Sequence, residues 1–210
     1  MYIKTGNNLR LLLLFTVLAI TPLWSLANTI LVLGDSISAA YGIPREAGWV
    51  NLFKQRLDEH YPDKYRVVNA SVSGDTTAGG LQRLPELLRE HNPEQVIVEL
   101  GGNDGLRGMS LKQMESNLEA IIRLSQNQGA EVLMLSVELP QSYGVFFNRR
   151  FQQVFDKIHS RLDVPRVPLG FGLLKDRNLL QNDGIHPTEE AQPIVVDAVW
   201  TALFPGHGSH

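Results

Sequence analysis

Side chains able to hydrolyse an acyl bond occur in four separate, glycine-rich segments of this 210-residue chain. A serine hydroxyl becomes an effective nucleophile only when a nearby base accepts its proton, and in proteins that base is most often histidine. Ser36 and His186 lie in the first and last of these segments, and Asp183 precedes the histidine by three residues. The four segments comprise residues 34–38, 69–76, 99–104 and 183–187.

Taken one at a time, these segments have plainer explanations than catalysis. Residues 34–36 are Gly-Asp-Ser and could open a helix, because aspartate and serine both favour caps and turns. His186 precedes Pro187 and could be a structural residue at the start of the last helix. Three of the four segments, however, follow consecutive predicted strands, where loops commonly carry function. Their combination therefore indicates an active site.

The same segments resemble the blocks that define the SGNH (GDSL) hydrolase family, which is named after an invariant serine, glycine, asparagine and histidine. The resemblance extends over essentially the whole chain after Ala27. Four blocks with the expected residues in the expected order are improbable by chance. The blocks match at Ser36, Gly74, Asn103 and His186.

One branch of the family is more similar than the rest. Residues 68–76, 98–108 and 183–187 look like the branch that contains acyl-CoA thioesterase I, lysophospholipase L1 and bacterial arylesterases. The resemblance implies a serine hydrolase with broad specificity. It would cleave carboxylic esters and thioesters of small acyl substrates through an acyl-enzyme intermediate.

The resemblance also implies a role for each residue of the site. Ser36 would be the nucleophile, His186 the base, and Asp183 the acceptor of a hydrogen bond from the other imidazole nitrogen. Attack on an acyl carbon creates an oxyanion, which the backbone N–H groups of Ser36 and Gly74 and the side-chain amide of Asn103 would stabilise. Glycine suits position 74, because the backbone there must approach the substrate closely.

Two loops are predicted to contact the acyl chain of the substrate. Residues 105–109 resemble a loop over the site in relatives, and residues 139–144 resemble a family segment near the bound acyl chain. We expect substrate contacts from Leu106, Met109 and Tyr143, although both segments could also be simple connections between elements.

Three further aspartates are interpreted as loop residues rather than as a carboxylate pair or a metal site. Asp35, Asp75 and Asp104 would make hydrogen bonds within the loops, with Asp104 holding the turn that carries Asn103. No spacing of histidines and carboxylates typical of a metal site occurs in the sequence. We therefore expect neither a metal nor another cofactor.

Apolar strand-like runs alternate with amphipathic helical patterns after residue 28. This order predicts an α/β fold, a three-layer α/β/α sandwich with a central parallel five-stranded sheet, as in flavodoxin-like SGNH hydrolases. Ligands of such sheets bind beyond the carboxyl ends of the strands. The predicted strands are residues 29–33, 65–68, 96–98, 132–137 and 164–169. The predicted helices include residues 49–57, 81–88, 111–122, 147–162 and 188–203.

Composition excludes several classes of protein. The chain has 43% hydrophobic and 20% charged residues, as one soluble domain would, which we assign to residues 28–205 with a tail at 206–210. The absence of cysteine excludes disulfides, a thiolate nucleophile and lipid attachment at cysteine. A net charge of −3 without a dense basic cluster argues against nucleic acid and gives no bulk attraction to anionic membranes. We expect a monomer.

The N-terminus has the pattern of a secretory signal peptide over residues 1–27. Lys4 and Arg10 precede an apolar run at residues 11–20, and small residues at 25 and 27 suit cleavage after Ala27. An uncleaved anchor is the alternative, but the run is short for a membrane span of about 20 residues. The sequence thus predicts a periplasmic or secreted protein with no stable membrane insertion after cleavage.

Three other functions remain open from the sequence. They are a carbohydrate O-acetylesterase on the same fold, a peptidase using the same triad, and a non-catalytic binding domain. The full set of triad and oxyanion residues argues against a binding domain. The chain has no room for the sugar-binding module that a carbohydrate esterase often carries, and a peptidase would need a stronger grip on the leaving amine.

Overall fold

The computed structural model describes residues 27–170, residue 174 and residues 177–206. The predicted signal peptide, apart from Ala27, and most of the predicted tail therefore lie outside the described residues. Among the helices that are described, none combines the length and the apolar character needed to cross a bilayer.

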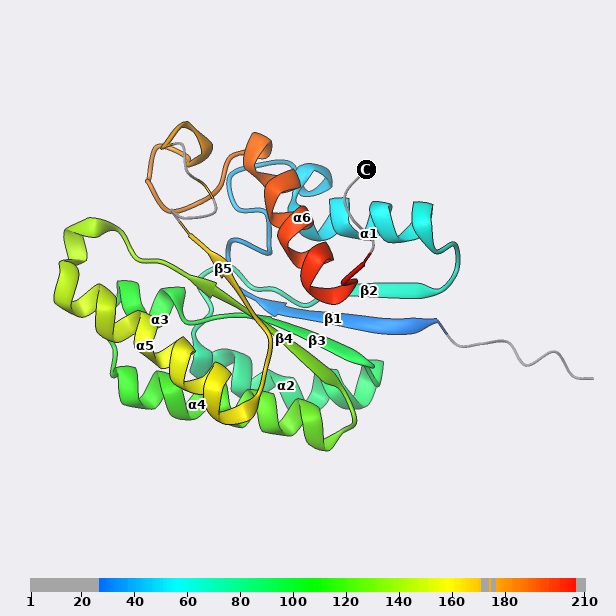
Figure 1. Cartoon of the computed structure of the whole chain (residues 1–210), viewed down its shortest axis with the longest axis horizontal. Coiled ribbons are helices and arrows are strands. Elements are labelled where there is room, and N and C mark those ends of the chain that lie inside the picture. The colour runs from blue at the N-terminus through cyan, green and yellow to red at the C-terminus, as the bar shows by residue number, and fades with distance from the viewer. Residues whose placement is uncertain (1–26, 171–173, 175–176, 207–210) are drawn as a thin grey trace, which may run out of the picture.

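Five parallel strands form one sheet in the order β2-β1-β3-β4-β5 (Figure 1). The apolar side chains of β1, β3 and β4 are buried on both faces of the sheet, which explains why these strands show no polar alternation. The strands are β1 (Asn28–Gly34), β2 (Tyr65–Asn69), β3 (Gln95–Glu99), β4 (Glu131–Val137) and β5 (Arg166–Leu169).

Helices cover both faces of the sheet, so the predicted three-layer sandwich is confirmed (Figure 1). Two helices, α1 (Trp49–His60) and α6 (Gln192–Leu203), pack on one face. Three helices, α2 (Thr77–His91), α4 (Leu111–Asn127) and α5 (Val145–Leu162), pack on the other. A short helix, α3 (Gly102–Leu106), follows β3.

Large apolar side chains fill the space between each helical layer and the sheet. Trp49 and Phe53 of α1 are fully buried, and the ring of Phe53 meets Trp200 of α6 edge-on at 6.2 Å. On the other face, the rings of Phe151 and Phe155 lie 5.3 Å apart and are also fully buried. Burying one such side chain contributes about 1.5–3 kcal/mol. The core thereby fixes the strand ends that carry the polar loops.

Most elements extend a few residues beyond their predicted ends; three others differ in kind or at their start, and proline explains two of these differences. The fifth strand begins at Arg166 rather than at 164, because Pro165 has no N–H to donate to the ladder. The last helix begins at Gln192 with Pro193 in its first turn, after a separate 3-10 turn over Glu189–Ala191. Helix α3 was expected to be a loop, since its sequence is rich in glycine.

Candidate active site

The polar segments singled out in the sequence converge at the carboxyl end of the sheet. Ser36 follows β1, and Asn103 lies in α3, directly after β3. Asp183 and His186 lie in the loop that precedes the last helix. Because β1 and β3 are adjacent parallel strands, their carboxyl ends bring Ser36 and Asn103 to the same edge.

Ser36, His186 and Asp183 form a continuous hydrogen-bonded series. The Oγ of Ser36 lies 2.8 Å from Nε2 of His186, and Nδ1 of the same ring lies 2.6 Å from Oδ2 of Asp183. The other carboxylate oxygen, Oδ1 of Asp183, accepts the backbone N–H groups of Ile185 at 2.9 Å and His186 at 3.0 Å. The aspartate therefore fixes both the imidazole ring and the loop that carries it.

Electrostatics keep Asp183 ionised in this arrangement. Partial burial acts to raise the pKa of Asp183, but hydrogen bonds from the side chain and backbone of His186 and from Ile185 outweigh it. The pKa therefore lies below its ordinary value of 3.8. The ring of Tyr41 lies 4.5 Å from the imidazole of His186 and covers one side of it. No motif in the sequence pointed to Tyr41.

Two of the residues predicted to stabilise an oxyanion, Asn103 and Gly74, have defined local geometry. The side-chain amide of Asn103 donates to Oδ2 of Asp35 at 3.0 Å, which orients the amide beside the nucleophile loop. Gly74 has a φ of +81°, a conformation that a residue with a Cβ would adopt only under strain. Arg107, which the sequence did not single out, donates from Nη2 to the carbonyl of Gly74 at 2.7 Å.

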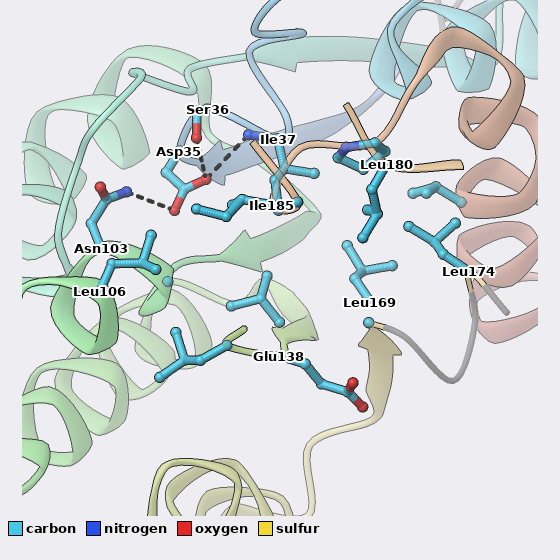
Figure 2. Close-up of a pocket in the computed structure, with 17 residues that line it drawn as sticks. Asp35, Ser36, Ile37, Asn103, Leu106, Glu138, Leu169, Leu174, Leu180 and Ile185 are labelled. Atoms are coloured by element: carbon cyan, nitrogen blue, oxygen red, sulfur yellow. Dashed lines mark hydrogen bonds between the residues drawn. The ribbon is translucent and has the colours of Figure 1, made fainter. Parts of the chain in front are cut away.

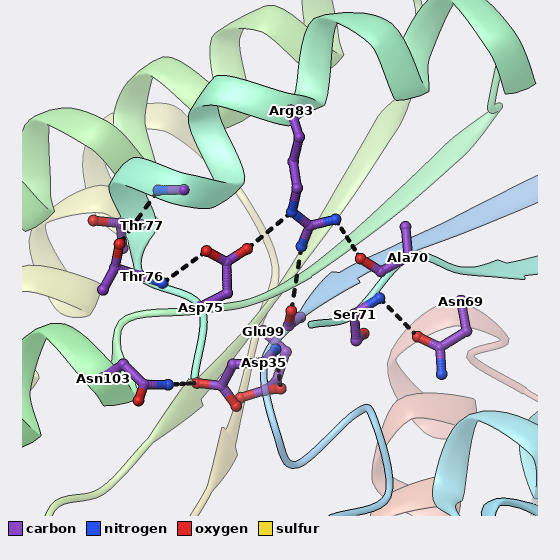
Figure 3. A network of polar contacts seen from close by, with 12 residues as sticks. Asp35, Asn69, Ala70, Ser71, Asp75, Thr76, Thr77, Arg83, Glu99 and Asn103 are labelled. Atoms are coloured by element: carbon purple, nitrogen blue, oxygen red, sulfur yellow. Dashed lines mark hydrogen bonds and ion pairs between the residues drawn. The ribbon is translucent and has the colours of Figure 1, made fainter. Parts of the chain in front are cut away.

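A buried pair of carboxyls lies beneath the nucleophile loop (Figure 3). Oε2 of Glu99 accepts the hydroxyl of Ser38 at 2.9 Å and the backbone N–H groups of Asp35 at 3.2 Å and Ser38 at 3.3 Å. Burial and the charge of Asp35 raise the pKa of Glu99 well above its ordinary value of 4.5. Burial also raises the pKa of Asp35, although hydrogen bonds from Ile37, Asn103 and Glu99 oppose this. The stronger upward shift of its pKa favours Glu99 as the residue that keeps a proton in this pair.

The substitution Glu99→Gln is expected to preserve activity and to improve stability at high pH. Glutamine can keep the three acceptor contacts and donate to Asp35 in place of the proton. In the unsubstituted protein, Glu99 holds its proton to a higher pH when folded than when unfolded. The free energy of unfolding should therefore fall as the pH rises from about 4.5 to the raised pKa, and stay lower above it. Denaturant titrations across this pH range should show no such fall in the free energy of unfolding of Glu99→Gln.

Two comparison variants test this assignment of the proton. Glu86→Gln removes an exposed carboxyl from α2 and should follow the unsubstituted protein at every pH. Glu99→Leu should be destabilised at all pH values, because each buried donor left without an acceptor costs about 1–3 kcal/mol. If Glu99→Gln lost stability in parallel with the unsubstituted protein as the pH rose, the proton would have to reside elsewhere.

The remaining aspartates anchor α2 rather than the active-site turn. Asp104 accepts from the backbone N–H of Thr77 at 2.8 Å and from its hydroxyl at 2.6 Å. The prediction that Asp104 holds the turn of Asn103 was wrong, because its side chain reaches the first turn of α2 instead.

Asp75 pairs with Nε of Arg83 at 2.9 Å, and Arg83 also donates to the carbonyls of Gly34 and Ala70. Arg83 thereby joins the first two active-site loops, which the sequence had not indicated.

An apolar cleft opens beside Ser36. Figure 2 shows Ser36 and Asn103 at one end of it, with leucine side chains extending away from them. Leu106 lines the cleft, whereas Tyr143 is not among the lining residues and donates from its hydroxyl to the carbonyl of Leu106 at 2.9 Å. Met109 is partly exposed and does not line the cleft. The apolar lining comprises Ile37, Leu106, Val137, Leu139, Leu169, Leu174, Leu180, Ile185 and Val195.

Comparison with known proteins agrees with this geometry. The sequence profile of the GDSL-like lipase/acylhydrolase family matches residues 32–193, a span that includes Ser36, Asn103 and His186. The chain belongs to this family. The GDSL hydrolase described here therefore has both the fold and the acyl-hydrolase chemistry that its four blocks predicted.

Relatives of this GDSL hydrolase are named for acyl-bond hydrolysis. Esterase TesA from Pseudomonas aeruginosa is 46% identical over 201 residues, which are 94% of this chain and 99% of the relative. Thioesterase 1/protease 1/lysophospholipase L1 from Escherichia coli is 43% identical over 181 residues, 85% of each chain. The solved structure of the esterase EstA from Pseudoalteromonas sp., inhibited by monoethylphosphonate, is 38% identical in sequence, with a TM-score of 0.77. The match covers 84% of this chain and 96% of the EstA chain.

Proposed function

We propose that this GDSL hydrolase cleaves esters and thioesters of fatty acyl chains, with Ser36 as nucleophile, His186 as general base and Asp183 as the residue that orients the base. The observation that carries the proposal is the hydrogen-bonded series from Ser36 through His186 to Asp183 at the mouth of an apolar cleft. A hydroxyl within 2.8 Å of an imidazole nitrogen can lose its proton during attack.

The reaction would proceed in two halves. Ser36 Oγ attacks the acyl carbon while Nε2 of His186 takes its proton, and the imidazolium then protonates the departing alcohol or thiol. This leaves an acyl ester on Ser36. Water attacks that ester with His186 again as base, releasing the carboxylic acid and restoring the serine hydroxyl. No cofactor enters either half.

The oxyanion formed in each half would be stabilised by three donors. These are the backbone N–H groups of Ser36 and Gly74 and the side-chain amide of Asn103. That amide has two hydrogens, and its bond to Asp35 occupies one, so the other remains for substrate. Loss of one such donor typically lowers kcat by about 100- to 1,000-fold.

The substrate class follows from the cleft and from the relatives. An apolar lining would bury an acyl chain at about 25 cal/mol for each Å² removed from water. An acetyl group would gain little from such a surface, which disfavours a carbohydrate O-acetylesterase. Two relatives carry the names of an esterase and of a thioesterase with lysophospholipase activity, which favours an enzyme that accepts ester, thioester and lysophospholipid acyl groups.

We further propose that the enzyme acts after export, as a monomer. The predicted signal peptide, residues 1–27, would be removed after Ala27, and residues 28–205 would form the catalytic domain in the periplasm or outside the cell. The support for this is the order of basic, apolar and small residues at the N-terminus.

A substrate series combined with covalent trapping tests the proposal. We expect hydrolysis of p-nitrophenyl esters that improves as the acyl chain lengthens to fill the cleft, together with hydrolysis of a fatty acyl-CoA. A reactive p-nitrophenyl phosphonate should inactivate the enzyme and add its mass to the peptide containing Ser36. A label on another residue, or activity restricted to acetylated sugars, would overturn the proposal.

A further inference from the structure

The first turn of α5 exposes two large apolar side chains beside the active site. Phe146 is 82% exposed and Val145 is 72% exposed, whereas Phe147 packs inward and its ring lies 6.3 Å from that of Tyr143. Adjacent apolar side chains with this exposure commonly mark an interaction surface on a soluble protein. Neither residue lines the cleft, so substrate binding there leaves them uncovered.

Two arginines share this face of α5. Arg149 and Arg150 follow Phe146 by three and four residues, which places all three side chains on the same side of the helix. Both arginines are exposed, and neither forms an ion pair with a described residue. We call Val145, Phe146, Arg149 and Arg150 the α5 rim.

Helix stability does not explain these arginines. Arg149 and Arg150 lie just past the first turn of α5, far from the C-terminal end at which positive charge would be stabilised by the helix dipole. The residues four positions before and after Arg149 and Arg150 carry no acidic side chain that could pair with them. Exposed cations without carboxylate partners beside exposed apolar side chains are instead typical of a surface that contacts anionic lipid.

The charge around the rim differs in sign from that of the whole protein. The chain has a net charge of −3, yet residues 105–114 and 139–155 contain no aspartate or glutamate. Tyr143 connects these two segments through its 2.9 Å hydrogen bond to the carbonyl of Leu106. Arg107 lies in the first of these segments, and Arg149 and Arg150 lie in the second.

The rim also adjoins the entrance to the cleft. Leu106 and Leu139 line the cleft, and the segment from Leu139 leads directly into the first turn of α5. In Figure 1 the start of α5 lies next to α3, near the carboxyl ends of the strands. A lipid surface in contact with the rim would therefore meet the mouth of the cleft.

We propose that the α5 rim docks the enzyme on the surface of anionic lipid aggregates, with Phe146 and Val145 inserted among the acyl chains and Arg149 and Arg150 at the headgroups. The delivery of acyl chains to Ser36 rests on the proposed function, whereas docking itself does not. The overall negative charge does not prevent docking, because charges beyond about 10 Å are screened at 0.1 M salt.

Vesicle binding without catalysis tests the docking surface. The protein is purified from the extracytoplasmic fraction of expressing cells, so that every variant has the same processed N-terminus, and all variants carry Ser36→Ala. Sedimentation with diether phosphatidylglycerol vesicles gives the partition coefficient, with phosphatidylcholine vesicles for comparison. We expect binding to phosphatidylglycerol that weakens as salt is added, and little binding to phosphatidylcholine.

The rim variants should lose this binding. Arg149→Gln with Arg150→Gln should lower the partition coefficient about 30-fold, since each cation near an anionic bilayer contributes roughly five-fold. Val145→Ser with Phe146→Ser should lower it about 10-fold through the loss of apolar burial. The control pair, Leu124→Ser with Arg89→Gln, removes similar exposed groups near the carboxyl ends of α4 and α2 and should bind normally.

The results separate docking from the proposed function. In the background with Ser36 restored, the rim variants should hydrolyse p-nitrophenyl acetate normally. Equal binding to both lipids, equal loss in the control pair, or displacement by soluble glycerol phosphate alone would overturn the docking proposal. If the protein bound vesicles in this way but hydrolysed no ester, the docking proposal would be supported and the proposed acyl-hydrolase function would be overturned.

Discussion

Replacement of Ser36 by alanine is expected to lower kcat for ester and thioester hydrolysis by about 10⁶-fold. The substitution removes the hydroxyl that lies 2.8 Å from Nε2 of His186 and would form the acyl bond, while the cleft and the proposed oxyanion donors stay in place. KM should change little for long acyl esters, because the alanine variant keeps the apolar lining. The measurement is steady-state hydrolysis of a p-nitrophenyl ester with enzyme sufficient to detect the residual rate.

A neighbouring serine provides the matched control for this experiment. Ser73 is exposed on the loop after β2, and Ser73→Ala should keep the rate of the unsubstituted enzyme. The phosphonate that labels Ser36 should leave Ser36→Ala unmodified and label Ser73→Ala fully. A Ser36→Ala enzyme that retained a tenth of the original kcat would show that another group attacks the substrate.

The fold could be predicted from the sequence because the hydrophobic pattern of a strand shows whether one or both faces of its sheet are covered. Apolar strands without alternation require helices on both faces, and all five predicted strands occur in one parallel sheet. Apart from helix α3, which was expected to be a loop, the errors lay at the ends of elements. There, local chemistry decides the boundary, as Pro165 shows at β5 and Pro193 at α6.

The sequence predicted the members of the site more readily than the residues that hold them. Ser36, Asn103 and His186 stand in short motifs, whereas Glu99 looks like the last residue of an apolar strand. Its raised pKa depends on burial and on the charge of Asp35, a residue 64 positions away. No pattern along the chain records such a contact. The same reason hid Arg83, whose guanidinium joins two loops across the sheet edge.

Replacement of Asp183 by asparagine is expected to lower kcat by about 10⁴-fold with little change in the loop. Asparagine keeps an oxygen to accept the backbone N–H groups of Ile185 and His186. Its amide, however, would donate to Nδ1 of His186, so the imidazole would carry its proton on Nε2 and could not accept one from Ser36. Steady-state kinetics at neutral pH measure the loss, and Glu189→Gln, which removes an exposed carboxyl nearby, should leave kcat unchanged.

Acid stability provides an independent readout for the same substitution. The lowered pKa of Asp183 means that the folded protein binds fewer protons than the unfolded chain near pH 3.8. Its contribution to the free energy of unfolding is therefore complete above that pH and is lost as the pH falls through the lowered pKa. Asp183→Asn lacks this component, so the stability difference between the two proteins should shrink in acid. A variant with high activity and an unchanged acid profile would show that Asp183 neither orients His186 nor shares charge with it.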